Sequence, residues 1–227
     1  MKKLEQLIAL LLFIIPAPGW TQGARTNISP NRLSFYAVQL VCPAATQIGC
    51  GSAAKPILMH LERHADINEA WLNRRGTIIA VVWKQEVAPK QHAKVIASIM
   101  ESKTVEMKGR ARKKALEEFM SAKNWYRGVE VDRLSEEEAG IIATRLARRM
   151  SRLISVTDEK LKSIEMGIAG VLKRRLTTDE PESQSQTQEE IVAVCKEYLS
   201  EDQIAVLKRA HDNGAFSHLR KEAGDDQ

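Results

Sequence analysis

The sequence lacks an apolar run long enough to cross a membrane. Its longest such run, Leu7 to Ile15, has nine residues, whereas a transmembrane helix needs about 20. The run follows two lysines and precedes two prolines, which is the layout of a secretory signal peptide. We therefore expect residues 1–23 to be a signal peptide of a periplasmic or secreted protein; an uncleaved anchor is the alternative.

Motifs of the common enzyme classes are also missing. The sequence contains no GxxxxGK[ST] phosphate loop, no GxSxG, no HExxH and no GxGxxG dinucleotide fingerprint. A cysteine nucleophile whose histidine base is close only in space would leave no such signature. Because nothing singles out such a pair, we expect a protein that is not an enzyme.

Cysteine is scarce, with three residues, and one is left over after any single disulfide. Export would permit a disulfide without requiring it. Cys42 and Cys50 stand in the stretch CPAATQIGCG with seven residues between them. Cys195 shares the apolar phase of Ile191 and Leu199, which favours a buried thiol.

The net charge of +5 is unevenly distributed. Residues 24–110, which include Cys42 and Cys50, contain 12 Lys and Arg against 6 Asp and Glu, whereas residues 111–227 contain 20 against 22. Nucleic acid is not an expected partner of an exported protein. The basic part therefore favours solubility or contact with an acidic surface such as a membrane.

The hydrophobic pattern divides the chain near Gly109. Before it, the predicted elements are a strand over 32–41, a helix over 53–64, a hairpin of 67–73 and 77–84, a helix over 89–102 and a strand over 104–109. This βαββαβ order predicts an α+β fold that begins with a ferredoxin-like antiparallel sheet carrying two helices on one face.

After Gly109 every periodic segment is helical, so we expect an all-α helical region over 110–227. A helix over 110–120 is followed by helices that start from caps. The predicted caps are Ser135 with Glu138, Thr157, Thr187 with Glu190, and Ser200 with Gln203. The polar stretch 177–188 predicts a flexible linker, and the amphipathic helices predict a small antiparallel bundle.

Three side-chain groups have simple structural interpretations. Trp125 and Tyr126 are expected to pack at the junction of the two parts. His60 and His64 lie one helical turn apart, where two imidazoles could share a metal ion, but exposed helix positions are favoured. Solvated polar side chains are also favoured for the arginine band on the predicted helix that starts at Ser135, which consists of Arg145, Arg148, Arg149 and Arg152.

The order and lengths of the elements in 32–109, with a cysteine loop between the first strand and the first helix, resemble the heavy-metal-associated domain of copper chaperones and metal-transporting ATPases. In that family a GMTCxxC loop holds a soft ion with two thiolates. The matching stretch here, IGCGSA, places Cys50 near the first cysteine and Ala53 near the second. The paired motif is broken, and Cys42 is the nearby thiol that could replace the missing one.

This resemblance implies that Cys42 and Cys50 bind Cu(I) or another thiophilic ion, with no other cofactor, and that a partner protein donates or accepts the metal. An N-cap at Ser52 would place Cys50 just before a helix N-terminus, which favours the thiolate. From the residues alone, three uses of the pair stay open: metal ligands, a disulfide or redox couple, and unpaired structural thiols.

The alternative to metal binding is a cell-envelope scaffold in which a disulfide closes the ferredoxin-like domain and the helices bind a protein partner or a membrane surface. The helix starts LSEEE, VTDEK and LSEDQ resemble the LTxxQ starts of periplasmic helical stress proteins. In that case the arginine band would supply a basic binding face.

Overall fold

The computed structural model describes residues 28–85, 89–100, 104–121, 123–178 and 184–216. The predicted signal peptide, residues 1–23, lies outside this part of the chain. In chain order the elements are β1 (Leu33–Ala37), α1 (Gly51–Arg63), β2 (Ile67–Asn73), β3 (Ile78–Trp83), α2 (Pro89–Ile99), β4 (Val105–Glu106), α3 (Gly109–Met120), β5 (Trp125–Arg127), α4 (Asp132–Leu153), α5 (Asp158–Thr177), α6 (Gln184–Lys196) and α7 (Glu201–Asp212).

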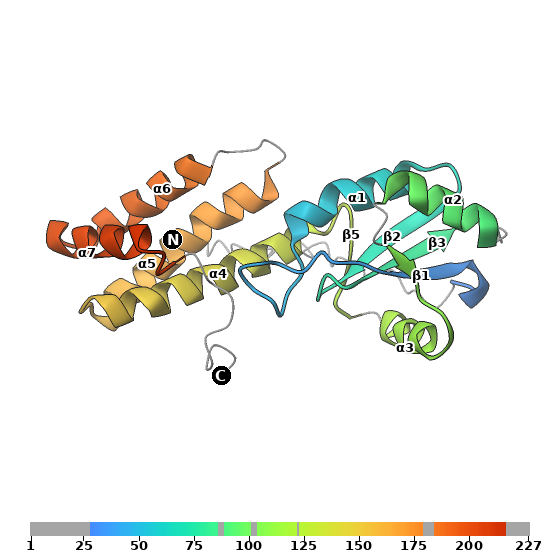
Figure 1. The fold of residues 1–227 in the computed structure, drawn as a ribbon, viewed down its shortest axis with the longest axis horizontal. Coiled ribbons are helices and arrows are strands. Elements are labelled where there is room, and N and C mark those ends of the chain that lie inside the picture. Colours follow the sequence, from blue (N-terminus) through green and yellow to red (C-terminus); the bar gives the residue numbers. More distant parts are fainter. Residues whose placement is uncertain (1–27, 86–88, 101–103, 122, 179–183, 217–227) are drawn as a thin grey trace, which may run out of the picture.

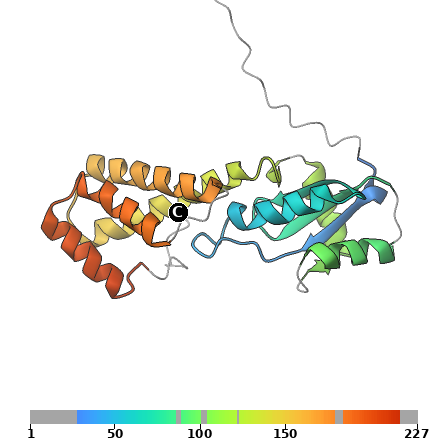
Figure 2. The same cartoon turned by 90° about the horizontal axis from the view of Figure 1, so that it is seen from above.

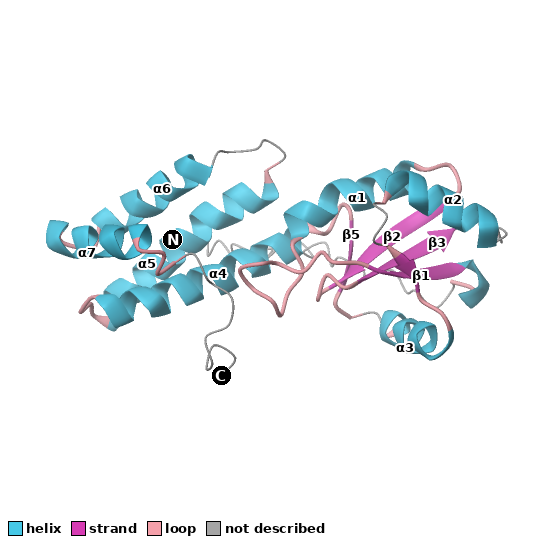
Figure 3. Ribbon diagram, viewed as in Figure 1, coloured by secondary structure: helices cyan, strands magenta, loops and turns pink. Residues whose placement is uncertain are grey.

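The strands lie in one half of an elongated molecule, and α5, α6 and α7 lie in the other (Figures 1 and 3). Helix α4 begins beside α1 in the sheet half and continues into the helical half, where it packs closely on α5. The view from above shows the same two halves (Figure 2). The fold is therefore α+β, as expected, and α4 is the element that belongs to both halves.

The sheet is antiparallel, with strand order β4-β1-β3-β2-β5. Strands β2 and β3 form the predicted hairpin. Its turn is closed by the side chain of Asn73, whose Oδ1 accepts hydrogen bonds from the amides of Thr77 (2.8 Å) and Ile78 (3.0 Å). Within residues 33–106 the elements follow the predicted βαββαβ order.

Strand β5 corrects the prediction of an all-α region after residue 109. Trp125, Tyr126 and Arg127 pair with β2 and extend the sheet by one strand. Three residues are too few to show a period of two, so this strand could not be separated from a loop. Of the two residues expected at the junction, Tyr126 contacts α4, because its hydroxyl donates to Oε1 of Glu137 at 2.7 Å. Trp125 instead packs against Phe35 and Phe119 in the sheet half.

Helices cover both faces of the sheet, because β3 is apolar on both sides. Alternate residues of β3 face two different clusters: Ile79 and Val81 pack with α1 and α2, whereas Ala80 and Val82 pack towards α3. The prediction of two helices on one face describes α1 and α2. Helix α3 matches the predicted helix over 110–120, but its place on the opposite face of the sheet was not predicted (Figure 1).

An aromatic cluster fastens α3 to its face of the sheet. The ring of Phe119 lies edge-on to Phe35 of β1, to Trp71 of β2 and to Trp125 of β5, with centroid distances of 5.9, 6.0 and 5.1 Å. Phe119 itself is fully buried. Such edge-to-face contacts add to the burial of apolar area, so this face has its own small core.

Helices α4 to α7 enclose a second core, which contains Cys195 at 5% exposure, in agreement with the predicted buried thiol. Two of the predicted caps are confirmed: Thr157 caps α5, and Ser200 with Gln203 forms a capping box for α7. Two are wrong, because α4 begins at Asp132 and α6 at Gln184. Ser135 and Thr187 are therefore buried inside helices.

The predicted linker over 177–188 is only partly tested. Residues 179–183 lie outside the described part of the chain, whereas α6 already includes residues 184–188. Among the residues that the structure describes, no helix is both long enough and apolar enough to span a bilayer.

Candidate functional site

The loop between β1 and α1 is folded back on itself by a single β-bridge. Val41 pairs with Gly49 in antiparallel fashion. On either side of this pair, the Cys42 amide donates to the Ile48 carbonyl (2.9 Å) and the Cys50 amide donates to the Leu40 carbonyl (2.7 Å). Both cysteines are therefore anchored at the base of the loop.

The bridge places Cys42 and Cys50 on the same side of the loop. Because side chains alternate along extended chain, each cysteine lies on the face opposite to that of the bridging pair. The two are diagonal neighbours, a relationship in which backbone positions lie about 7–8 Å apart. Cys42 is buried, with 2% exposure, and Cys50 is half-buried. The structure brings together the two residues that the sequence analysis selected, and both thiols are free.

The carboxylate of Glu138, on α4, lies at this same point. Glu138 is 2% exposed. Its Oε2 accepts a hydrogen bond from the Gly51 amide at the first residue of α1, at 3.1 Å, and the carboxylate interacts with the thiols of both cysteines. Burial raises the pKa of Glu138, although these thiols and the Gly51 amide oppose the rise.

Glu138 also explains where α1 begins. We predicted an N-cap at Ser52, but α1 starts at Gly51 with Cys50 in the N-cap position and no side-chain cap of its own. The carboxylate from α4 takes that role by accepting from the Gly51 amide, one of the amides that a helix start leaves unpaired. The Ser52 hydroxyl instead lies 3.4 Å from Sγ of Cys50.

Burial makes both thiols weaker acids than free cysteine. Burial, followed by the neighbouring Glu138, raises the pKa of Cys42 to about 12. The pKa of Cys50 is also raised, chiefly by burial, while the Ser52 hydroxyl acts in the opposite direction. The expectation that the helix N-terminus would favour a Cys50 thiolate is therefore wrong, because desolvation of the charged form outweighs the helix dipole here.

Close packing against α4 fixes the start of α1. A Cβ atom on Gly51 would stand 2.3 Å from Oγ of Ser135, so a larger residue does not fit there. Within the described residues, the buried Ser135 hydroxyl has no hydrogen-bond partner. Ser135, one helical turn before Glu138 on α4, thus packs directly against the first residue of α1.

Arg145, two helical turns after Glu138, holds the tip of the cysteine loop. Its Nη1 donates to the Ala44 carbonyl oxygen (2.6 Å) and its Nη2 donates to Oε1 of Gln47 (2.7 Å). Arg145 is 6% exposed and Arg149, which donates to the Ala215 carbonyl, is 7% exposed. These two members of the predicted arginine band are therefore structural and buried, which corrects the expectation of a solvated polar face.

Two glycines allow the cysteine loop to pack closely against the β2–β3 turn. The Gly49 amide donates to the Arg74 carbonyl (2.7 Å), and a Cβ atom on Gly49 would stand 2.8 Å from Cα of Gly76. Gly76 has φ +72°, and its own Cβ would meet the Leu40 carbonyl oxygen at 2.3 Å. Positive φ and close approach both require glycine at position 76.

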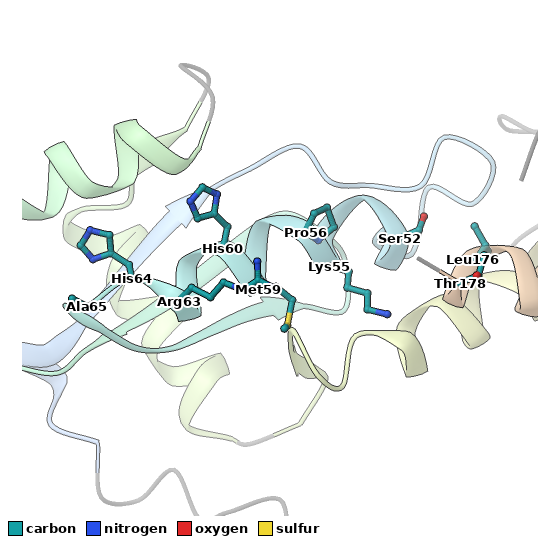
Figure 4. Close-up of a pocket in the computed structure, with 10 residues that line it drawn as sticks. All are labelled: Ser52, Lys55, Pro56, Met59, His60, Arg63, His64, Ala65, Leu176 and Thr178. Carbon is teal, nitrogen blue, oxygen red and sulfur yellow. The ribbon is translucent and has the colours of Figure 1, made fainter. Parts of the chain in front are cut away.

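His60 and His64 line one end of an open groove of about 910 Å³ along α1, whose other end is lined by Ser52, Leu176 and Thr178 (Figure 4). The ring Nδ1 of His64 accepts from the Asp66 amide at 3.2 Å, and His60 is exposed. In the described part of the chain, no group of three or more His, Cys, Asp or Glu side chains is placed to hold a metal ion. The two thiols and Glu138 do not form such a group.

The sequence analysis missed Glu138 and Arg145 as parts of this site. A signal for Glu138 was present, since it continues the buried stripe of Ile142, Leu146 and Met150 at intervals of four residues, where a charged side chain is unusual. Arg145 carried no such signal, because it stands among other arginines. Their partners lie 87 and 98 residues away in the sequence.

Comparisons with known proteins add no further constraint. No family model matches the chain, and neither the curated proteins nor the solved structures include a significant match.

Proposed function

We propose that the protein binds one thiophilic metal ion, such as Cu(I), as cargo through the thiolates of Cys42 and Cys50. The observation that carries this proposal is the convergence of both thiols on one buried carboxylate beside the start of α1. The proposal is one of binding and not of catalysis. It also takes residues 33–106 as a ferredoxin-like unit similar to the heavy-metal-associated domain, with β5 as an added edge strand.

The donor set suits a soft ion that accepts two ligands. Thiolates are the ligands that select Cu(I) over harder ions. Diagonal positions about 7–8 Å apart lie at the upper limit for a disulfide, whose Cα atoms are usually within about 6.8 Å. Two metal–sulfur bonds of about 2.3 Å reach further than one sulfur–sulfur bond of about 2.05 Å. This comparison favours a bridging ion over a direct bond.

Glu138 has a separate role in the proposal, as a proton acceptor. Both thiols must lose their protons when an ion binds, and both already interact with the carboxylate. Two thiolates with one monovalent ion carry a net negative charge, which would raise the pKa of a buried carboxylate next to them. Glu138 would take up one of the released protons, so that the buried site carries one negative charge both before and after the ion binds.

A second candidate follows from the same geometry. The cysteines flank one β-bridge, so a small shift of the loop could bring them into disulfide contact. An exported protein would meet the oxidising conditions that this bond needs. The domain would then be a closed scaffold, and the helices α4 to α7 would bind a protein partner or a membrane surface.

The test is anaerobic titration of the reduced full-length protein with Cu(I) against a competing chelator, read by native mass spectrometry. We expect one ion per chain, lost in Cys42→Ser and in Cys50→Ser and kept in the matched control Cys195→Ser. No uptake, together with a mass about 2 Da lower after mild oxidation that either substitution prevents, would overturn metal binding and support the disulfide.

A further inference from the structure

A cavity of about 480 Å³ lies between α4, α5, α6 and α7, with Ile142 and Leu146 among the residues of α4 that line it. Pockets for small molecules in proteins measure about 300–1,000 Å³. Its walls are mostly apolar and come from all four helices: Leu146, Met150, Leu172, Ile191 and Leu207, with Phe216 after α7. Nothing in the proposed metal site uses this space.

Positive charge borders the cavity at its edge. Arg175 of α5 and Lys208 and His211 of α7 all line it, with Asp212 as the single acidic residue. Asp212 lies 3.3 Å from Nδ1 of His211, so the acidic group faces a neighbour that can be cationic. The border therefore has an excess of cationic side chains.

Arg175 differs from the two cations that precede it. Lys173 pairs with Glu136 at 2.9 Å and Arg174 pairs with Glu190 at 2.6 Å. Within the described residues, neither Arg175 nor Lys208 makes an ion pair or a side-chain hydrogen bond. Both of these cations line the apolar cavity.

We infer that this cavity binds a single-chain amphiphile with an anionic head, a fatty acid, with its chain among the helices and its carboxylate at Arg175 and Lys208. An apolar chain gains from leaving water for this lining, and an ionised carboxylate forms strong charge-assisted hydrogen bonds with a guanidinium group. A neutral molecule with a chain of the same length would gain from burial of that chain but would not form the hydrogen bonds of a carboxylate. The inference does not depend on the cysteine loop.

The experiment titrates the full-length protein with palmitate below its micelle concentration, beside the neutral analogue hexadecanol, using calorimetry. We expect one palmitate per chain. Arg175→Glu should weaken palmitate binding by about tenfold or more and leave hexadecanol binding nearly unchanged. Lys162→Glu, the same charge change on an exposed face of the same helix, should alter neither.

Two further variants make the result specific to the cavity. Ile191→Trp places a larger side chain into the cavity, and urea unfolding checks that the variant is folded; we expect it to lose both ligands. The Cys195 thiol lines the same space, so bound palmitate should slow its alkylation in the native protein. Cys42→Ser and Cys50→Ser should bind palmitate as the wild type does.

Several results would overturn the inference. One is the absence of palmitate binding; another is binding that Arg175→Glu and Ile191→Trp leave unchanged. Uptake by vesicles of phosphatidylglycerol without binding of free palmitate would assign the cations to a membrane surface. Binding that occurs only after deletion of residues 217–227 would assign the cavity to the chain's own C-terminal segment.

Discussion

Arg145 of α4 donates a hydrogen bond to Gln47 at the tip of the cysteine loop, across 98 residues of sequence. The same guanidinium group also holds the Ala44 carbonyl. Because a hydrogen bond from a charged group contributes about 1.5–3 kcal/mol, we expect Arg145→Met to lower the free energy of unfolding by about that amount. Hydrogen exchange of the Ala45 and Ile48 amides should be faster in this variant.

The control for this prediction is Arg152→Met, which removes an exposed arginine at the end of the same helix. It should leave exchange in the loop unchanged. Equal exchange rates at Ala45 and Ile48 in the wild type and in Arg145→Met would show that the loop holds its conformation without α4.

The close approach of Gly76 to the cysteine loop predicts an unusually costly glycine substitution. Gly76→Ala must adopt a positive φ and must also place its Cβ 2.3 Å from the Leu40 carbonyl oxygen. Gly109 also has a positive φ, of 55°, but a Cβ atom there would meet nothing within 4 Å. We expect Gly109→Ala to cost about 1–2 kcal/mol and Gly76→Ala to cost clearly more, as measured by urea unfolding. Equal losses of stability in the two variants would mean that the cysteine loop can move away from residue 76.

The aromatic cluster under α3 predicts a large loss of stability on truncation. Phe119 is fully buried against three aromatic rings, so Phe119→Ala should cost about 3–5 kcal/mol. Its neighbour Met120 is 37% exposed, and Met120→Ala should change stability by no more than about 0.5 kcal/mol. If the two substitutions cost the same in denaturant unfolding, α3 would not be packed on the sheet as described.

His92 predicts a stability that falls in mild acid. Its ring stacks on Trp83 at 3.9 Å and is 7% exposed. Burial lowers the pKa of His92, although Glu106 opposes the change. The unfolded chain therefore binds a proton more readily than the folded protein, and the contribution of His92 to stability is full above the ordinary pKa of about 6.5 and is lost as the pH falls through it.

Urea unfolding at pH 7.5 and pH 5.5 would measure this effect. We expect the wild type to lose roughly 0.5–1 kcal/mol more than His92→Phe between the two pH values. The variant keeps an aromatic ring on Trp83 and cannot titrate. His60→Gln, which removes an exposed histidine, should retain the wild-type dependence, and a His92→Phe variant that does the same would place the titration elsewhere.

The role proposed for Glu138 predicts the number of protons released when Cu(I) binds near pH 7. Because the pKa values of both thiols are raised, two protons leave the sulfur atoms, and Glu138 should take up one of them. We expect a net release of about one proton from the wild type and about two from Glu138→Gln. Glu136→Gln, an exposed position on the same helix, should match the wild type.

Calorimetry in buffers of different ionisation enthalpy counts these protons. Release of two protons by both the wild type and Glu138→Gln would remove Glu138 as the proton acceptor and leave the two-thiolate site itself untouched.

The fold was predictable where a pattern repeats over many residues. The β2–β3 hairpin and α1 follow from alternation and from a helical apolar stripe, which depend on local sequence alone. The capping residue of α1 did not follow, because the group that caps Gly51 comes from α4. The short strand β5 likewise depends on an edge that β2 offers in three dimensions.

The two cysteines of the candidate site were predictable from the sequence, whereas their surroundings were not, because these depend on contacts between distant parts of the chain. Cys42 and Cys50 are rare residues in one loop, so the sequence points to them directly. Glu138 was predicted as part of a capping box, a local pattern that its burial against the cysteines overrides. The raised pKa of Cys50 could not be predicted either, because it depends on how deeply α4 and the loop bury the thiol.

The number of residues between Glu138 and Arg145 on α4 cannot change without moving one of the two side chains away from the cysteine loop. Seven residues make nearly two full turns of an α-helix, so both side chains leave α4 on one side and reach the base and the tip of the same loop. One residue inserted between them would rotate the later part of the helix by about 100° and turn Arg145 away from Gln47. It would also rotate Leu146 and Met150 relative to Ile142, which lines the same cavity, so a single insertion should disturb the cavity as well as the loop.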